Sequence, residues 1–211
     1  YETQSSYPIT VSVSDGVNTV TQDITINITD VNEPPSFGSS AVFSAAENQT
    51  SIGRVIVGDQ EGDSLTYTLS GADANSVSIS TSGSDVGTLT FNSAPDYETK
   101  NTYSFTLSVT DGTNTSTQDI TINITDANEA PIITSASSFD AAENQSAVGT
   151  VTANGADGDD LTFAVTGFEI QISSTGVLTF LNDSRDYETQ SSYPITVSVS
   201  DGVNTVTQDI T

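Results

Sequence analysis

Carboxylate and amide side chains recur at short spacings along the chain, and they are the groups best suited to chemistry. Asp96 and Glu98 are two positions apart, so on an extended segment both side chains project from the same face. Asp126, Asn128 and Glu129 stand together further along the chain. Oxygen ligands of this kind suit hard cations such as calcium, which accepts roughly six to eight oxygens in flexible geometry. The pattern therefore predicts calcium sites.

The composition excludes several other chemistries. The 211 residues include 28 Asp and Glu but only 3 Lys and Arg, a formal net charge of −25, and contain no Cys, His, Met or Trp. Without Cys or His the chain has no disulfide, thiolate nucleophile, Ser-His-Asp triad or zinc site of the usual kinds. So acidic a chain repels phosphate, so we expect no nucleic-acid partner. No apolar run approaches the ~18 residues of a membrane helix, so we expect no direct membrane insertion.

The chain is built of repeats. Residues 1–25 and 187–211 are identical, and a diverged copy begins at Tyr97. A repeat of roughly 90–96 residues indicates a string of domains rather than a solenoid of small units. We expect residues 1–33 to be the C-terminal fragment of a repeat plus a linker, 34–130 a complete repeat plus a linker, and 131–211 a nearly complete repeat. Since Tyr1 begins within a repeat, we expect the sequence to be a window from a longer chain.

Within a repeat, apolar residues alternate with polar ones, which predicts β-strands. Residues 103–109 and 120–124 show this period of two clearly, and further strands are expected at 52–58, 65–70, 76–80 and 86–91. Asp-Gly pairs join alternating runs, as in hairpins. We predict an all-β chain of tandem immunoglobulin-like Greek-key sandwiches, about seven strands each and arranged end to end.

In such a sandwich the loops lie at the two ends, where acids of neighbouring repeats can converge on the linker. Glu47 opens the complete repeat, Asp59 and Glu61 occupy its first loop, and Asp111 lies in its last hairpin. Carboxylates within a few Å repel one another by several kcal/mol at low effective dielectric. A divalent cation that bridges these carboxylates neutralises the repulsion and links the two neighbouring repeats.

These motifs together resemble a cadherin repeat, in particular the cadherin-like repeats of large bacterial surface proteins. The linkers DVNEPP (30–35) and DANEAP (126–131) are similar to the family's DxNDNxP, and Glu-Asn occurs at 47–48 and again at 143–144. The other motifs are Asp-Tyr-Glu at 96–98 and 186–188, Asp-Gln-Glu at 59–61, and a late Asp at 111 and 201. The resemblance implies calcium between successive repeats, about two to three ions per junction.

The resemblance also implies which residues bind. For the first junction it implies Glu2, Asp30, Asn32, Glu33, Asp59, Glu61 and Asp111. For the second it implies Glu47, Asp96, Glu98, Asp126, Asn128, Glu129, Asp157 and Asp201. For a junction beyond Thr211 it implies Glu143, Asp186 and Glu188.

The sequence departs from the family pattern in three ways. Each linker is one residue shorter than the family's, and Glu33 and Glu129 stand where the family has Asp. Gly155 aligns with Asp59, so the second junction lacks one carboxylate unless Asp159 or Asn154 replaces it. We therefore expect fewer or weaker ions at that junction.

Other interpretations of the same residues carry less weight. A pair such as Asp96 and Glu98 is enough for glycoside hydrolysis, but it recurs in each repeat without a cluster of aromatic platforms, so we expect no enzyme. Tyr7, Tyr103 and Tyr193 share the parity of the apolar residues on their strands, which predicts core positions.

We therefore predict a calcium-stiffened segment of a secreted or cell-surface bacterial adhesin or fibre, acting as a stiff spacer or adhesive rod. Its partners are then the adjacent repeats of the same chain. An alternative is a module that binds polysaccharide, or one that joins copies of itself between cells or in a filament. Homophilic exchange of the kind seen in animal cadherins uses an inserted Trp, which this chain lacks.

Overall fold

The computed structural model describes residues 2–181 and 185–211. The chain divides into two compact units, residues 1–126 and 127–211. Strands dominate both units, and among the described residues the helical part is limited to two single 3₁₀ turns, η1 (Ala74–Ser76) and η2 (Gly83–Asp85). In the described part of the chain, neither turn has the length or the apolar character needed to cross a membrane. The prediction of an all-β immunoglobulin-like chain is confirmed.

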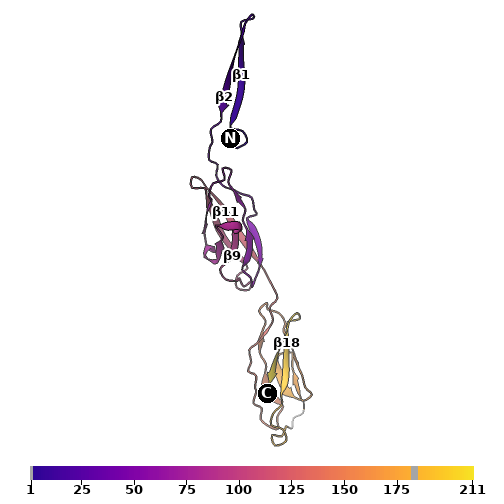
Figure 1. Cartoon of the computed structure of the whole chain (residues 1–211). Coiled ribbons are helices and arrows are strands. Elements are labelled where there is room, and N and C mark those ends of the chain that lie inside the picture. The colour runs from indigo at the N-terminus through magenta and orange to yellow at the C-terminus, as the bar shows by residue number, and fades with distance from the viewer. Residues whose placement is uncertain (1, 182–184) are drawn as a thin grey trace. The chain divides into compact units, whose positions relative to one another are not determined.

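The first unit begins with a two-stranded hairpin. Strands β1 (Ser6–Ser14) and β2 (Thr19–Asn27) pair antiparallel along their whole length, with Tyr7 opposite Ile26 (Figure 1). Every residue of both strands is exposed, including the apolar ones, because the hairpin forms a sheet of its own. A two-stranded hairpin has no second layer against which to bury its apolar face. The prediction that Tyr7 occupies a core position is therefore wrong: its side chain is exposed.

The rest of the first unit is a sandwich of two sheets. The larger sheet has the order β4-β11-β10-β7 and comprises β4 (Val42–Ala46), β11 (Thr115–Thr125), β10 (Thr102–Thr110) and β7 (Thr66–Ser70). The facing strands are β5 (Ser51–Arg54), β9 (Thr88–Phe91) and β8 (Val77–Ile79), with the short pair β3 (Ser36–Phe37) and β6 (Val57–Gly58).

Alternation along the strands builds the core of this sandwich. In β10 the side chains of Phe105, Leu107 and Val109 are buried, and Ile120 and Ile122 of β11 face the same interior. Side chains of a strand point alternately to its two faces, so the other half of each strand stays nearer to solvent. The alternation of apolar and polar residues that the sequence predicts for these two strands is therefore observed as an alternation of buried and more exposed side chains.

The segment predicted as one strand at 52–58 is interrupted. The backbone N–H of Val55 leaves the ladder and donates to the carbonyl oxygen of Gly87 at 2.8 Å. Gly87 has φ +86°, and a Cβ built on it would lie 2.2 Å from the Val55 oxygen. Only glycine fits so close to a carbonyl in this conformation. Gly176 and Val151 repeat the arrangement in the second unit, with a Cβ distance of 2.1 Å.

The second unit repeats the sandwich with fewer strand residues. Its sheets have the orders β15-β18-β19, β13-β17-β16 and β12-β14. The strands are β12 (Ile132–Ile133), β13 (Ala147–Thr150), β14 (Ala153–Asn154), β15 (Thr162–Val165), β16 (Ile170–Ile172), β17 (Val177–Phe180), β18 (Ile195–Ser200) and β19 (Thr205–Ile210). Leu178, Val197 and Val199 are fully buried at its centre, and Tyr193 packs against this core as predicted.

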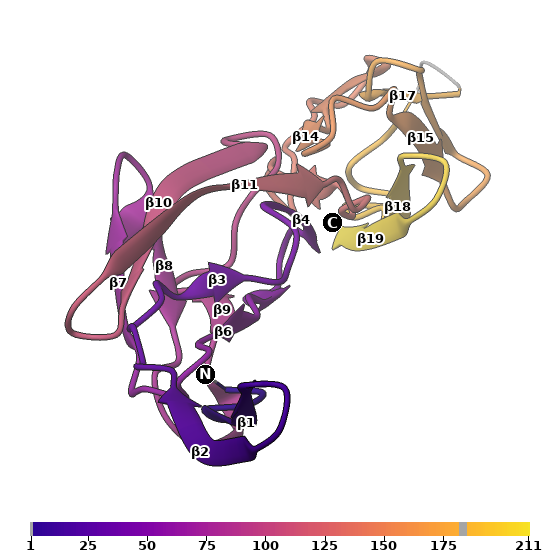
Figure 2. The ribbon, with the colours of Figure 1, turned by 90° about the horizontal axis from the view of Figure 1, so that it is seen from above.

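The two units differ in one strand. In the first unit, β4 pairs in parallel with residues 121–125 of β11, so β4 runs beside the last part of that strand (Figure 2). In the second unit, β19 stops at Ile210, and the corresponding residues 138–142 form no strand.

Candidate metal centre

One acidic site of the first unit is organised by the loop of the last hairpin. Asp111 Oδ1 accepts hydrogen bonds from the backbone N–H groups of Thr113 and Asn114, both at 2.6 Å. The bond from Asn114 is the main cause that lowers the pKa of Asp111, which keeps the carboxylate charged. Its Oδ2 accepts from the side-chain amide of Asn32 at 2.9 Å, and the Asn114 amide donates to the Asn32 carbonyl at 3.1 Å. These bonds hold the linker residue Asn32 beside the hairpin.

Glu33 and Glu61 bring two carboxylates together next to this loop. The backbone N–H of Glu33 donates to Glu61 Oε2 at 3.2 Å. Glu2, Glu33 and Glu61 each offer an oxygen, and these oxygens all lie within 4.8 Å of one another. The hydrogen bond that the Glu33 carboxyl shares with Glu61 is the main cause that raises the pKa of Glu61. In the absence of a cation this group is therefore a site of charge repulsion.

Several oxygens of this site are buried and lack hydrogen-bond partners among the described residues. They are Glu33 Oε2, Glu61 Oε1 and Asp59 Oδ2. A buried carboxylate oxygen normally has a partner, because burying a charge without one is costly. These oxygens are therefore candidates to coordinate a metal ion, and oxygen is the ligand atom that calcium prefers.

A second acidic group of the first unit centres on Glu47, which is only 4% exposed. Its Oε2 accepts a hydrogen bond from the backbone N–H of Tyr97 at 2.8 Å, which fixes the carboxylate against the Asp-Tyr-Glu segment. Glu47, Glu98 and Asp126 have carboxylate oxygens within 4.8 Å of one another. Asp96 instead accepts from the backbone and hydroxyl of Thr99, and the backbone bond is the main cause that lowers its pKa.

The second unit repeats the linker arrangement with its own residues. The Asn128 amide donates to Asp201 Oδ2 at 3.0 Å, and the Glu129 N–H donates to Asp157 Oδ2 at 2.9 Å. Asp201 Oδ1 accepts from the backbone N–H groups of Val203 at 2.7 Å and of Asn204 at 2.5 Å. Partial burial acts to raise the pKa of Asp201, but the bonds from Asn204 and Asn128 outweigh it and lower the pKa overall. Asp157 Oδ1 is buried and unpartnered in the described part of the chain.

Gly155 occupies the position that Asp59 has in the first unit, so the second unit lacks that carboxylate. A Cβ at Gly155 would meet Leu161 Cδ2 at 3.4 Å, an ordinary contact distance. The two residues considered as replacements, Asp159 and Asn154, are exposed. The backbone therefore has room for a carboxylate that the sequence does not supply.

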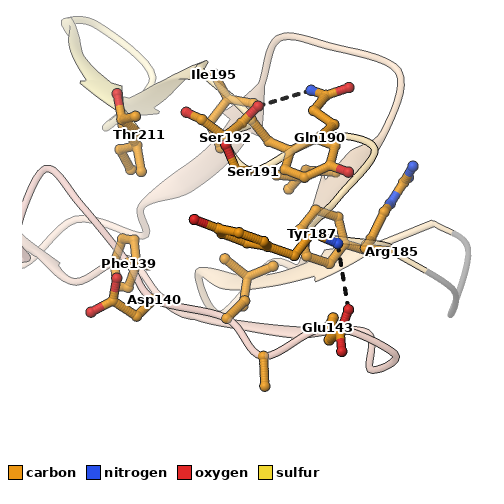
Figure 3. Close-up of a pocket in the computed structure, with 17 residues that line it drawn as sticks. Phe139, Asp140, Glu143, Arg185, Tyr187, Gln190, Ser191, Ser192, Ile195 and Thr211 are labelled. Carbon is orange, nitrogen blue, oxygen red and sulfur yellow. Dashed lines mark hydrogen bonds between the residues drawn. The ribbon is translucent and has the colours of Figure 1, made fainter.

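A third acidic group is formed by the opening Glu-Asn motif and the Asp-Tyr-Glu motif of the second unit. Glu143, Asp186 and Glu188 have oxygens within 4.8 Å of one another, and Glu143 Oε2 accepts from the Tyr187 N–H at 3.5 Å (Figure 3). The hydroxyl of Thr189 is the main cause that lowers the pKa of Asp186. All three acids are exposed.

The remaining predicted ligand, Asp30, is exposed and belongs to none of the three-acid groups described above within residues 2–181 and 185–211. Two kinds of residue were missed. Asn114 and Asn204 fix the acidic hairpin loops, and the signal was the recurring DGxN sequence at 15–18, 111–114 and 201–204. Asn48 and Asn144, which follow the opening Glu, both have φ +60°, a conformation that Asn tolerates better than most residues.

Comparisons with known proteins agree with this architecture. Residues 32–123 match the family model described as a bacterial Ig domain. Human CDH23 EC21-23 has a TM-score of 0.71 at 21% identity, covering 99% of this chain and 74% of that one. Human protocadherin-24 EC1-2 has a TM-score of 0.52 at 20% identity, covering 86% and 98%. The human desmocollin-1 ectodomain has a TM-score of 0.57 at 23% identity, covering 99% of this chain but only 47%, about half, of its own length.

A search of curated proteins found no match. The fold is similar to that of cadherin ectodomains, so the resemblance found in the sequence is confirmed for the fold. More specifically, the complete sandwich of the first unit is the part similar to bacterial Ig domains.

Proposed function

We propose that this chain is a calcium-binding segment of a secreted or cell-surface bacterial adhesin or fibre, in which bound calcium stiffens the linkers between repeats. The observation that carries the proposal is the set of buried carboxylate oxygens around Glu33, Glu61 and Asp59 that have no hydrogen-bond partner among the described residues. Such oxygens need a bound cation or a proton, and calcium is available to them outside cells.

The ligands proposed for the first linker come from four parts of the first unit. The acids Glu33 and Glu61 form the centre. They are joined by Glu2 from the segment before the hairpin, Asp59 from the first loop, and Asp111, which Asn32 positions. Asp30 lies two residues before Asn32 and completes the proposed set. We propose two to three ions here.

The recurrence of the same residue types around 126–131 leads us to propose the same role there. The proposed ligands are Glu47, Asp96, Glu98, Asp126, Asn128, Glu129, Asp157 and Asp201. Because Gly155 replaces a carboxylate, we propose fewer ions at this linker. Glu143, Asp186 and Glu188 form a further proposed site.

The mechanical role follows from charge. Acids held close together repel, so a linker without cation samples arrangements that separate them. A cation coordinated from both sides of a linker favours a narrower range of arrangements. Extracellular calcium modules work at about 10⁻⁴–10⁻³ M, so weak individual sites suffice there. We propose that the adjacent repeats are the main partners and that the segment acts as a spacer rather than an enzyme.

Isothermal titration calorimetry with calcium tests the assignment directly. We expect the double variant Glu33→Gln and Glu61→Gln to lose at least one binding event of the wild-type protein. Asp85→Asn provides the matched control, because Asp85 is an acid of the same unit that lies in η2, outside the acidic groups. An unchanged titration for the double variant would remove the basis of the proposal.

A further inference from the structure

The side chain of Lys100 joins two parts of the first sandwich. Its Nζ lies 4.7 Å from the centre of the Tyr103 ring, within the range of a cation–π interaction. Tyr103 itself packs edge to face against Phe91, with the ring centres 5.0 Å apart. The same Nζ forms an ion pair with one carboxylate oxygen of Asp73, and this bond is the main cause that lowers the pKa of Asp73. The other oxygen of Asp73 accepts a hydrogen bond from the Ser104 N–H at 2.8 Å.

The second unit builds the same arrangement around a different cation. Phe180 and Tyr193 repeat the edge-to-face pair, again with ring centres 5.0 Å apart. The guanidinium carbon of Arg185 lies 5.1 Å from the centre of the Phe180 ring and 5.3 Å from that of Tyr193. Its Nη1 donates to Glu169 Oε1 and its Nη2 to the Glu169 carbonyl, both at 3.3 Å. Each sandwich therefore holds one cation between an aromatic pair and an acid.

The two cations are attached at different positions of the same loop. The carbonyl of Pro95 accepts the N–H of Asn48 at 3.0 Å. The carbonyl of Arg185 accepts the corresponding N–H, that of Asn144, also at 3.0 Å. Arg185 therefore stands at the position that Pro95 has in the first unit.

Lys100 has Gln190 as its counterpart. The N–H of Lys100 donates to the carbonyl of Asp96 at 2.9 Å. The N–H of Gln190 makes the same bond to the carbonyl of Asp186 at 3.0 Å. The cation thus follows the Asp-Tyr-Glu motif in the first unit and precedes that motif in the second. The loops 95–100 and 185–190, which carry the motif, are called the motif loops below.

The acid keeps its position while the cation moves. Asp73 and Glu169 each lie two residues after a glycine. Pro194 stands where the first unit has Ser104, directly after the tyrosine, and proline has no N–H to donate. The longer acid therefore occurs where this backbone bond is missing and the cation is attached elsewhere. The chain has only three Lys and Arg among 211 residues, and two of them serve this one purpose.

In the first unit the motif loop is held at both ends. Near its start, the N–H of Tyr97 donates to Glu47 Oε2 at 2.8 Å. At its other end Lys100 holds it to the sandwich through the ion pair and the aromatic ring. Glu98 lies between these two points, and its carboxylate oxygen is within 4.8 Å of oxygens of Glu47 and Asp126.

We propose that Lys100 and Arg185 are positioning residues, which hold the motif loops against their sandwiches so that the loop acids are in place before calcium binds. The inference rests on the proposed function, since it assigns these acids to calcium. Without a cation the carboxylates repel one another, and a free loop would move to separate them. Anchoring the loop lowers the cost of ordering it when calcium binds, and so raises the affinity.

Calorimetric titration of the 211-residue protein with calcium tests the role of Lys100. Losing a positive charge favours a bound cation by simple electrostatics, so a Lys100 without an anchoring role predicts tighter binding for Lys100→Gln. We expect the opposite, a loss of affinity of about fivefold, because the loop is released. Arg54→Gln is the matched control for charge, since Arg54 lies in the same unit and donates instead to the Val86 carbonyl at 2.8 Å. It should bind at least as tightly as the wild type.

A rescue variant separates anchoring from a general loss of stability. Combining Lys100→Gln with Pro95→Arg and Asp73→Glu rebuilds the arrangement of the second unit in the first. This triple variant should regain most of the affinity that Lys100→Gln loses. The inference is overturned if Lys100→Gln binds calcium as tightly as the wild type, or if the triple variant binds no better than Lys100→Gln.

Amide hydrogen exchange in EGTA keeps this test distinct from that of the proposed function. Exchange at residues 97–100 should be about tenfold faster in Lys100→Gln than in the wild type, and should slow again in the triple variant. This readout needs no calcium. If the wild type binds no calcium, the proposed function fails, and faster exchange would still support the anchoring of the loop. Unchanged exchange at these residues would overturn the inference whatever calorimetry shows.

Discussion

The side-chain amide of Asn32 donates a 2.9 Å hydrogen bond to the carboxylate of Asp111, 79 residues later in the sequence. Asn128 makes the same bond to Asp201 at 3.0 Å in the second unit. In both units, therefore, a linker amide holds the acid of the last hairpin loop, and the second oxygen of that acid is held by backbone N–H groups of its own loop. The linker is tied to the sandwich by a contact that also orients a proposed ligand.

Replacing the linker amide should weaken calcium binding more than folding. Asn32→Ala frees one oxygen of Asp111 and removes a proposed ligand, so we expect about a tenfold loss of calcium affinity, equivalent to about 1.4 kcal/mol. Without calcium the melting temperature should change little, because the bond lies at the edge of the sandwich. Asn75→Ala, in η1, is the control for loss of an amide. Equal effects of the two substitutions on calorimetric affinity would show that Asn32 has no special role.

The pair Glu33 and Glu61 should make the calcium-free protein respond to pH in a distinctive way. The pKa of Glu61 is raised in the folded state, so the folded state holds this proton more tightly than the unfolded chain does. In EGTA, stability should therefore rise as pH falls from neutral through that raised pKa, and this contribution should be absent at higher pH. Glu61→Gln should be more stable than wild type at neutral pH in EGTA and should lack this rise. Denaturant unfolding at several pH values measures both, and an identical pH profile for the variant would contradict the account.

Two glycines with similar backbone angles should respond differently to the same substitution. Gly87 has φ +86° and would place a Cβ 2.2 Å from the Val55 oxygen, whereas Gly112 has φ +98° and nothing within 4 Å. Gly112→Ala should cost about 1 kcal/mol from backbone strain alone. Gly87→Ala should cost at least about 3 kcal/mol, since the Val55 backbone must also shift. Thermal unfolding compares the two variants. Equal melting temperatures would show that the close approach of Gly87 to the Val55 oxygen does not require glycine.

Restoring the missing carboxylate should strengthen calcium binding by the second unit. Gly155→Asp adds an acid at the position that Asp59 occupies, and its Cβ would meet the flexible end of Leu161 at 3.4 Å and the Asp159 backbone no closer than 3.8 Å. We expect a higher affinity or an additional bound ion in calorimetry, with stability in EGTA lowered by the extra repulsion. Gly158→Asp is the control, because Gly158 lies in the same loop with open space around it. A variant at 155 that binds no better than the control at 158 would argue against the alignment of the two units.

The sequence predicts the sandwich well because its signals are local. Alternation at Phe105, Leu107 and Val109 gives the buried face of β10 directly, and the Asp-Gly pairs mark the turns. The break after Arg54 was not predicted, because it depends on the approach of Gly87, a residue distant in sequence. The exposure of Tyr7 was missed for a related reason: its parity is that of a core residue, but the hairpin has no second layer.

The candidate site shows the same limit. Recurring acids identify Glu33, Glu61 and Asp111 as a set, and the structure brings Glu33 and Glu61 together. The amide of Asn114, which fixes the linker, was not identified from its type alone, since a turn asparagine usually serves only its own turn. Its bond to the Asn32 carbonyl joins residues 82 positions apart, and only a folded chain shows that contact.

The central claim is that calcium at the linkers stiffens the molecule, and small-angle X-ray scattering of the same sample with calcium and after addition of EGTA tests it most directly. Extrapolating the curves to zero protein concentration keeps self-association out of the comparison. We predict a well-defined maximum dimension with calcium, and in EGTA a scattering curve typical of a flexible chain of domains. Identical curves in both conditions, for a protein that binds no calcium in calorimetry, would contradict the account.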